Sequence, residues 1–298
     1  MCLQRKPARP DAQPGSIMKF AKYHALGNDY IVIDPADVEV GKVEAAAPAI
    51  CRRNFGAGSD GILLGPSSAT NGVFGLRIFN PDGSEAEKSG NGIRIFSRYL
   101  YDRGLVGSEP FDINTPGGIV RARVLSNGKL VKAEMGKVSF SSRDIPVSGP
   151  DREVLNENIR SLGRDFKFCA GTIGNPHCVL LCKDVSPGDA RTFGPSIETD
   201  PRFPNRTNVQ FMKALDGNNI RIEIWERGAG YTLASGSSAS VAAAAARKLG
   251  MCDSAVNVHM PGGVLKIDVS DDFSVSMVGP VVKICEGMID REILDTGR

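Results

Sequence analysis

Short apolar stretches recur in the same order in the two halves of the chain. Each copy opens with an apolar strand, expected at 30–34 and at 178–182. A second apolar strand, expected at 76–80 and at 220–225, leads into a polar loop. Short apolar runs bounded by turn residues are typical of buried strands. The pattern therefore predicts strands near the start and in the middle of each copy.

A helix follows the polar loop in each copy, and strands follow the helix. The helices are expected over 92–103 and 238–249, each ending beside a glycine, which suits the left-handed position after a helix. Alternation then predicts β-rich segments at 119–135 and 264–278, the first with a hairpin turn at 127–128. Strand-rich segments with one long helix each favour an α+β half-domain, a curled, mostly antiparallel sheet around a central helix.

Four short motifs indicate that the two copies are a duplication. They occur in the same order, and the distance between partners drifts only from 147 to 145 residues. The pairs are LGNDYI at 26–31 with IGNPHC at 173–178, RIFN at 77–80 with EIWE at 223–226, KSGN at 88–91 with ASGS at 234–237, and TPGG at 115–118 with MPGG at 260–263. Such agreement is the signature of an internal repeat. We therefore expect two pseudo-symmetric half-domains that face each other across a ligand cleft.

The repeat also suggests the domain limits. We assign residues 18–138 to the N-terminal half and 139–280 to the C-terminal half, and we expect 281–298 to pack back onto the first half. Residues 1–17 carry charge and proline without the apolar core of a secretory signal. We interpret them as a disordered tail, with Met18 as a candidate start.

Composition narrows the functions open to such a fold. In 298 residues, Lys and Arg number 36 and Asp and Glu number 34, which leaves a net charge of +2. No basic stripe with interleaved aromatic residues is present, so no nucleic-acid partner is expected. No apolar run reaches the roughly 18 residues that a membrane span needs, so no membrane partner is expected either. A small-molecule ligand is favoured.

The seven cysteines are scattered, odd in number and without the close pairs of a zinc site. Cys178 and Cys182 lie four positions apart, but the segment between them reads as a buried strand, and the chain has only three histidines. We interpret the cysteines as small buried residues of a cytoplasmic protein in a reducing compartment. No metal is expected.

Ser-Gly precedes the expected helix in both copies, at Ser89 and at Ser235. Unpaired backbone N–H groups and the helix dipole make such a helix start suitable for a carboxylate. Gly90, Gly92 and Gly236 let a ligand approach the backbone. Serine is also a common N-cap, which is a purely structural alternative. Because the repeat directs both loops toward one cleft, we expect the two serines on opposite faces of the ligand.

Polar residues at strand ends and loop starts complete the candidate site: Asn28, Asn80, Asn175, Asn208, Glu226 and Arg227. An asparagine alone is more often a turn residue than a ligand contact. Together these residues offer amide donors, a cation for a carboxylate and an anion for an ammonium group, which suits an amino acid with a second polar end. His24 and His177 flank the Gly-Asn segments and are candidate supporting acid/base groups, although a histidine beside a tight turn is commonly structural.

Five motifs give the chain a resemblance to the diaminopimelate epimerase family that runs nearly end to end from Met18. They are HALGNDY at 24–30, FNPDGSEAEKSGNG at 79–92, GNPH at 174–177, NRTNV at 205–209 and WERGAGYTLASGS at 225–237. The resemblance implies an epimerase without a cofactor, in which one cysteine removes the α-proton and a second returns a proton to the opposite face. It implies that the substrate's far end meets the six polar residues named above. Its α-carboxylate would rest on Gly90, Asn91, Gly236 and Ser237.

Both family cysteine positions carry serine in this chain, at Ser89 and Ser235. A thiol has a reference pKa of about 8.5, and helix N–H groups bring its thiolate within reach. A serine hydroxyl is far less acidic and needs a base beside it. His24 and His177 are the candidates for that base. Tyr231 is a further departure, because family members usually have glutamate at this position.

The leading interpretation is a PLP-independent epimerase of diaminopimelate, in the lysine and cell-wall precursor pathway, or a divergent relative of it. A homodimer is a further expectation. Two alternatives stay open: an isomerase of another small acid on the same fold, as in the proline racemase and phenazine-pathway groups, and a ligand-binding homologue with impaired catalysis. Exchange of the substrate α-proton with heavy water separates the enzymes from the binding protein.

Overall fold

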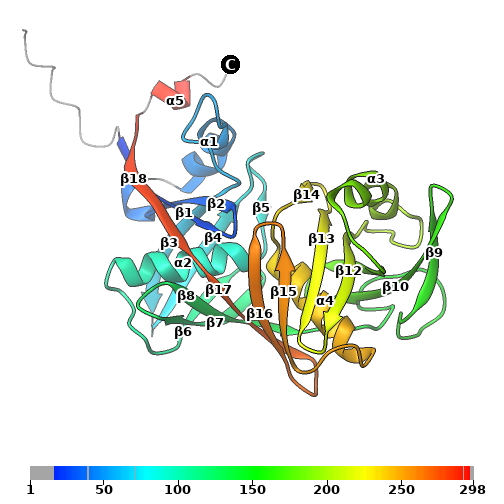
Figure 1. Cartoon of the computed structure of the whole chain (residues 1–298). Coiled ribbons are helices and arrows are strands. Elements are labelled where there is room, and N and C mark those ends of the chain that lie inside the picture. The colour runs from blue at the N-terminus through cyan, green and yellow to red at the C-terminus, as the bar shows by residue number, and fades with distance from the viewer. Residues whose placement is uncertain (1–16, 39, 71, 291, 296–298) are drawn as a thin grey trace, which may run out of the picture.

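The computed structural model describes residues 17–38, 40–70, 72–290 and 292–295 (Figure 1). Except for Ile17, the predicted tail 1–17 lies outside the described residues. The described strands form one hydrogen-bonded sheet of 18 strands, which curls around a helix in each half of the chain. In this part of the chain, no helix combines the length and the apolar character needed to cross a membrane.

Each half contains the same series of strands and α-helices, and the first half has a short 3-10 helix in addition. The first half has β1 (Ile17–Ala25), β2 (Asn28–Ile33), the 3-10 helix η1 (Pro35–Asp37), α1 (Val40–Cys51), β3 (Ile62–Thr70), β4 (Val73–Phe79), β5 (Glu85–Ala86), α2 (Gly90–Asp102), β6 (Phe111–Thr115), β7 (Gly118–Leu125) and β8 (Leu130–Lys137). The second has β10 (Arg164–Thr172), β11 (Pro176–Leu181), α3 (Pro187–Glu198), β12 (Asn208–Asp216), β13 (Asn219–Glu226), β14 (Gly230–Thr232), α4 (Gly236–Lys248), β15 (Ala255–Met260), β16 (Gly263–Val269) and β17 (Ser274–Pro280). The short helix α5 (Glu292–Asp295) lies near the C-terminus.

Two further strands show how the chain ties its halves together. β9 (Glu157–Ser161) pairs antiparallel with β10 in the second half. β18 (Val282–Asp290) takes the corresponding place beside β1, so the end of the chain returns to the first half (Figure 1). The antiparallel pairing of β8 with β17 joins the strands of the two halves directly. The halves therefore share both a sheet and a strand.

Equivalent hydrogen bonds in the two halves confirm the repeat. The amide of Gly117 donates to the carbonyl of Glu87 over 2.9 Å, and the amide of Gly262 donates to the carbonyl of Leu233 over 2.9 Å. These bonds join the Pro-Gly-Gly turn to the residues just before the central helix in each copy. The duplication therefore extends to the backbone contacts that hold the two loops beside α2 and α4.

The central helices α2 and α4 fill their sheets in different ways. α2 presents Ile93, Phe96 and Leu100 to the core, each 0% exposed. α4 carries five consecutive alanines at 242–246, and all of them are 0% exposed. A helix enclosed on every side is apolar all round, and small side chains let the surrounding strands approach it closely. Both helices are thereby fixed in position, which fixes where their N-termini lie.

The sequence predicted one long helix per half, whereas the structure contains a second helix in each, α1 and α3. α1 covers the outer face of the first sheet, where Ile50 packs in one cluster with Ile31 and Ile33 of β2. Tyr30 and Val32 of the same strand point the other way, into the core around α2. A strand that is apolar on both faces needs cover on both sides. The unbroken apolar run of β2 was the signal for this second helix.

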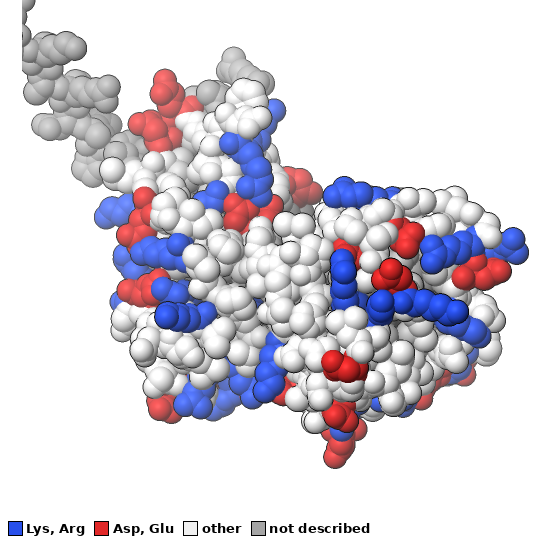
Figure 2. All heavy atoms as spheres, in the orientation of Figure 1, with Lys and Arg blue, Asp and Glu red and all other residues white. Residues whose placement is uncertain are grey.

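Charged side chains are mixed on the face of the molecule shown in Figure 2, where blue and red alternate and white atoms cover the middle. This agrees with the near balance of 36 basic and 34 acidic residues in the sequence. No field of one sign covers this face, so charge alone does not direct a ligand to it.

Candidate active site

The two serines singled out in the sequence cap the two central helices. Ser89 is the N-cap of α2, and its Oγ accepts a hydrogen bond of 3.1 Å from the amide of Gly92. Ser235 is the N-cap of α4, and its Oγ accepts one of 3.4 Å from the amide of Ser238. Each serine hydroxyl thus satisfies one of the otherwise unpaired amides of its helix start.

The two helix starts touch each other at the junction of the halves. A Cβ atom added to Gly90 would lie 3.3 Å from the Cα of Gly236, and the reverse distance is also 3.3 Å. The side-chain amide of Asn91 crosses the junction and donates to the carbonyl of Ala234 over 3.2 Å. The positive ends of two helix dipoles therefore meet at one point, which favours a bound anion.

Each serine has a second polar neighbour, and the two neighbours differ. The hydroxyl of Tyr30 lies 3.3 Å from Ser89 Oγ, and burial raises the pKa of Tyr30 to about 12. Burial raises the pKa of the Glu226 carboxylate, and the nearby hydroxyl of Ser235 acts on that pKa in the opposite direction. The negative charge of Glu226 also raises the pKa of Tyr30, so Glu226 and Tyr30 interact electrostatically across the junction of the two halves. The sequence reasoning did not identify Tyr30 as a site residue.

The two histidines are hydrogen-bonded elsewhere. His177 is 0% exposed, and its ring nitrogens lie 3.0 Å from Asn175 Oδ1 and 3.1 Å from Gln210 Nε2. Burial lowers the pKa of His177 to about 3, so its ring is neutral at physiological pH. His24 Nδ1 accepts from the amide of Gly27 over 3.3 Å. Among the described residues, no hydrogen bond links either histidine to Ser89 or Ser235, and the hydroxyl that lies beside Ser89 is that of Tyr30.

Asn28 lies beside the helix starts and not apart from them. Its Nδ2 donates to Asp60 over 2.9 Å, and its Oδ1 accepts from Asn91 Nδ2 over 2.9 Å. Asp60 is held in turn by Arg53, with Nη2 to Oδ1 at 2.6 Å. On the other side, Arg94 Nη2 donates to Asn91 Oδ1 over 2.7 Å. A chain of hydrogen bonds therefore fixes Asn28 and Asn91 between an acidic and a basic residue.

The turn that carries Glu226 and Arg227 is anchored by two buried side chains. Glu198, 4% exposed at the end of α3, accepts from Trp225 Nε1 over 2.7 Å and from the amide of Gly228 over 2.8 Å. The Oδ1 of Asn208 accepts from the amide of Arg227 over 3.0 Å. The structure therefore gives Asn208 a positioning contact with Arg227, whose own side chain is exposed.

The remaining predicted site residues lie in turns of their own half. Asn80 Nδ2 donates to Ser84 Oγ over 2.9 Å within the turn between β4 and β5. Asn175 precedes β11 and bonds His177, as described above. Ser237, in the first turn of α4, lies with its Oγ 3.5 Å from that of Ser235. In the repeat, Asn175 corresponds to Asn28 and Asn80 corresponds to Glu226.

Tyr231 has a structural contact that accounts for its presence. Its hydroxyl donates to Glu223 over 2.8 Å, and Glu223 is 0% exposed in β13. The guanidinium of Arg191, from α3, lies 4.1 Å from the centre of the Tyr231 ring. Tyr231 thus satisfies a buried carboxylate and holds α3 against the sheet. It contacts neither serine among the described hydrogen bonds.

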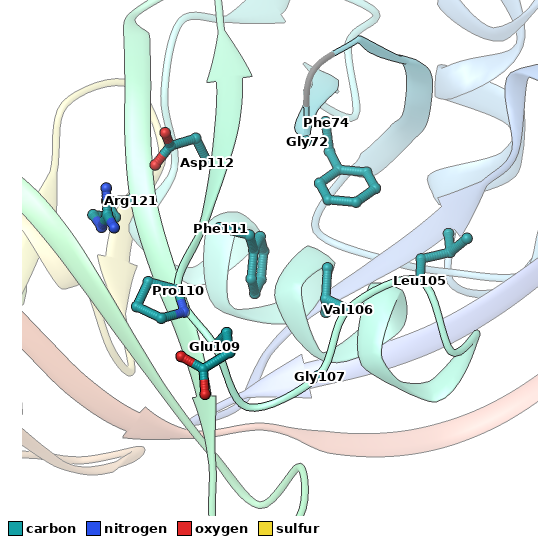
Figure 3. A pocket seen from close by; sticks show the side chains of 10 residues that line it. All are labelled: Gly72, Phe74, Leu105, Val106, Gly107, Glu109, Pro110, Phe111, Asp112 and Arg121. Atoms are coloured by element: carbon teal, nitrogen blue, oxygen red, sulfur yellow. The ribbon is translucent and has the colours of Figure 1, made fainter.

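A surface pocket lies away from these residues, near the C-terminal end of α2 (Figure 3). The rings of Phe74 and Phe111 meet edge to face in its wall, with centres 6.0 Å apart. Asp112 and Arg121 stand at its side (Figure 3). No predicted site residue lines it, so this pocket is separate from the helix starts.

Comparisons with known proteins agree with this geometry. The family model described as diaminopimelate epimerase matches residues 20–141 and 169–284. Diaminopimelate epimerase 2 from Nostoc sp. is 62% identical over 276 residues, covering 93% of this chain and 97% of the relative. Diaminopimelate epimerase from Moorella thermoacetica is 40% identical over 276 residues, covering 91% of this chain and 98% of the relative.

Solved structures of other enzymes share the fold at low sequence identity. A hydroxyproline epimerase from Agrobacterium vitis matches with a TM-score of 0.66 at 14% identity, covering 92% of this chain and 93% of that chain. A PhzF-family phenazine biosynthesis protein from Bacillus anthracis matches with a TM-score of 0.67 at 15% identity, covering 91% and 98%. At these identities the likeness shows the fold alone.

Proposed function

The chain belongs to the diaminopimelate epimerase family, and on that premise we propose that it epimerises diaminopimelate between its L,L and meso forms. The observation that supports the proposal is the contact between the two helix starts that Ser89 and Ser235 cap. In the proposed complex the two serines lie on either side of one bound anion. A carboxylate held there would have its neighbouring α-carbon between the two hydroxyls. That placement is what two-base proton transfer requires.

The substrate α-carboxylate would rest on the amides at the starts of α2 and α4, including those of Gly90, Asn91, Gly236 and Ser237. Glu226 offers an anion for an ammonium group, and Arg227 offers an exposed cation for the distal carboxylate. Asn80, Asn175 and Asn208 would complete the far end of the site. Asn28 fits the near end better, because it is bonded to Asn91 at the start of α2.

Serine in place of a thiol is workable because each hydroxyl has a proton partner. On one face, Ser235 Oγ would take the α-proton while its own hydroxyl proton moves to Glu226. On the other face, Ser89 would give its hydroxyl proton to the α-carbon and take the proton of Tyr30. The step leaves Glu226 protonated and Tyr30 as a phenolate, and exchange with solvent restores both. The reverse reaction starts from protonated Glu226 and the Tyr30 phenolate, and each proton moves back along the same path.

The proposal extends to cofactor, partner and location. The side chains at the site supply both the acid and the base, so the reaction needs no PLP. A homodimer is supported by the exposed apolar residues of β18, Val282, Ile284 and Met288, at 49%, 49% and 67% exposure. The six cysteines of the described residues are all free thiols, which supports a reducing cytoplasm. No nucleic acid or membrane is part of the proposed function.

Turnover of L,L- and meso-diaminopimelate in heavy water, measured beside binding, tests the function. We expect both epimers to bind, to exchange their α-proton and to interconvert. Binding without exchange would mean that the chain is a ligand-binding homologue, and exchange only with another small acid would identify a different isomerase. The single variants Ser89→Ala and Ser235→Ala should bind the ligand and lose epimerisation.

Cysteine restoration at both positions provides the companion test. The double variant Ser89→Cys/Ser235→Cys places a more acidic group at each helix start. We expect it to keep epimerase activity and to shift the pH dependence of turnover toward lower pH. If the double variant binds diaminopimelate but neither exchanges nor epimerises it, the side chains at these two positions do not decide the reaction.

A further inference from the structure

Arg94 is the largest fully buried side chain of the described residues. It lies in the second turn of α2, one turn after the helix start, and it is 0% exposed. Gly279 of β17 leaves room for it, because a Cβ there would come within 3.1 Å of Arg94 Nε. Arginine is rarely buried in full without an anionic partner, so this position needs an explanation.

The hydrogen-bond partners of Arg94 among the described residues are all neutral. Nη2 donates to Asn91 Oδ1 over 2.7 Å, and Nη1 lies 3.3 Å from the carbonyl of Gly90 and 3.2 Å from Met277 Sδ. Nε has no hydrogen-bond partner. Within the described residues Arg94 forms no ion pair, and burial lowers its pKa to about 9, which leaves the side chain charged at neutral pH.

The contacts of Arg94 lead to both helix starts. Gly90 and Asn91 belong to the first turn of α2. Met277, which contacts the guanidinium, also lies against the start of α4, where its Sδ would be 3.1 Å from a Cβ on Gly236. The buried charge therefore lies directly behind the point where the two helices meet.

The second copy of the repeat shows that holding the helix start does not require a charge. The residue 146 positions after Arg94 is Ser240, and its Oγ donates to the carbonyl of Gly236 over 2.8 Å. This is the carbonyl equivalent to that of Gly90. In α4 a neutral serine donates this hydrogen bond to the backbone carbonyl, so the bond alone does not account for a positive charge at the equivalent position of α2.

We propose that Arg94 is the fixed counter-charge of the substrate α-carboxylate, a positioning residue that acts through the helix starts without touching the ligand. The inference rests on the proposed function for the identity of the ligand. An isolated charge in a protein interior destabilises the fold, because it has lost its hydration without gaining an ion pair. A carboxylate bound on the far side of the first turn of α2 would offset that loss of stability. The positive charge of Arg94 therefore strengthens carboxylate binding, and the bound carboxylate in turn stabilises the buried charge.

Ligand-dependent stabilisation of Arg94→Met tests the proposal, with Ser240→Ala as the matched control. Thermal unfolding of the full chain is followed against acetate, with chloride at equal ionic strength as reference, and against diaminopimelate. We expect Arg94→Met to bind both carboxylates about 10- to 100-fold more weakly than the wild type. Ser240→Ala should bind them as the wild type does, and Arg94→Lys, which keeps the charge, should recover part of the affinity.

The stability without ligand supplies the second readout. An uncompensated charge destabilises the empty protein, so Arg94→Met should unfold at the same or a higher temperature than the wild type in chloride. A purely structural arginine would instead lower the unfolding temperature and leave the carboxylate affinities unchanged, which would overturn the proposal. Should Arg94→Met not fold, Arg94→Gln gives the same comparison with a neutral polar side chain.

The two probes keep this inference apart from the proposed function. If acetate protection depends on Arg94 while diaminopimelate does not bind even the wild type, the function is wrong and the counter-charge stands. If diaminopimelate is turned over with equal KM by wild type and Arg94→Met, the function stands and the counter-charge is refuted.

Discussion

Removing the hydroxyl of Tyr30 should stop proton transfer on the face of the α-carbon that Ser89 serves, while leaving the fold intact. Tyr30→Phe keeps the ring, which is 7% exposed in the core, and deletes only the oxygen 3.3 Å from Ser89 Oγ. Ser89 still accepts the amide of Gly92 at 3.1 Å. The loss of one neutral hydrogen bond costs about 0.5–1.5 kcal/mol of stability. The variant should therefore fold.

The effect on chemistry should be much larger and should depend on the epimer. A positioned general acid or base contributes roughly 10²- to 10⁴-fold to the rate, or about 3–5 kcal/mol of barrier. With Tyr30 absent, the epimer whose α-proton faces Ser235 should still exchange that proton through Glu226 but return to its starting configuration. The opposite epimer should neither exchange nor epimerise. Glu226→Gln should stop exchange of the epimer whose α-proton faces Ser235, because the hydroxyl proton of Ser235 then has no group to accept it.

Proton NMR of each epimer in heavy water separates exchange from inversion. The control is Tyr23→Phe, because Tyr23 is also buried and its hydroxyl donates to Asp102 over 3.0 Å at the opposite end of α2. This control should lose a comparable amount of stability and keep both reactions. Equal loss of exchange for both epimers in Tyr30→Phe, or unchanged epimerisation, would refute the division of the two faces between Tyr30 and Glu226.

Three further changes test other parts of the site. Glu198→Gln replaces the charged acceptor of the Trp225 indole by a neutral one. The variant should lose about 2 kcal/mol of stability and have a higher substrate KM. An unchanged KM would show that the turn with Arg227 does not need this anchor. Gly90→Ala places a Cβ 3.3 Å from the Cα of Gly236. This crowding should lower the free energy of unfolding by ~1–3 kcal/mol and reduce activity. A variant as stable and active as the wild type would contradict the close contact of the helix starts. The pKa of His177 is lowered from 6.5 to about 3, so the unfolded chain binds a proton that the fold excludes. The free energy of unfolding in urea should fall as pH falls from 6.5 toward 3, by up to about 4 kcal/mol, and His177→Gln should remove that slope.

The repeat was readable in the sequence because its motifs fall where backbone geometry restricts the residue type. The Pro-Gly-Gly turns and the Ser-Gly helix starts recur at nearly constant spacing, and the structure confirms them through paired hydrogen bonds such as Gly117 to Glu87. The hairpin at Asn127 and Gly128 was likewise predictable, since both residues have positive φ, at 52° and 88°. Local rules of this kind act within a few residues.

The outer helices α1 and α3 were harder to predict. Pro48 and Pro195 lie inside them, and proline normally marks a helix boundary. What holds these helices is the apolar outer face of the sheet, including Ile31 and Ile33 under α1. Tertiary burial outweighed the local signal in both cases, and periodicity in a short window does not detect it.

The proton partners of the serines could not be found from the motifs alone. Tyr30 and Ser89 are 59 residues apart, and only the curvature of the sheet around α2 brings β2 to the helix start. The histidines were chosen for their chemistry, but burial of His177 and its bonds to Asn175 and Gln210 occupy its ring nitrogens. Which side chains from distant parts of the chain come into contact depends on how the elements pack, and the spacing of motifs along the sequence does not show this.

The scaffold is nearly symmetric, whereas its chemistry is not, and the substrate explains the difference. Two equivalent helix starts can present equivalent groups to the two faces of one carbon, but the carboxylate, the amine and the remaining chain of an amino acid differ from one another. The repeat supplies the symmetric part, the backbone amides and the serines. Departures from it supply the rest: Tyr30 facing one serine and Glu226 the other, and Arg94 where the second copy has Ser240. The positions at which the two copies carry different residues are therefore the ones that let this duplicated fold distinguish the unlike groups of its substrate.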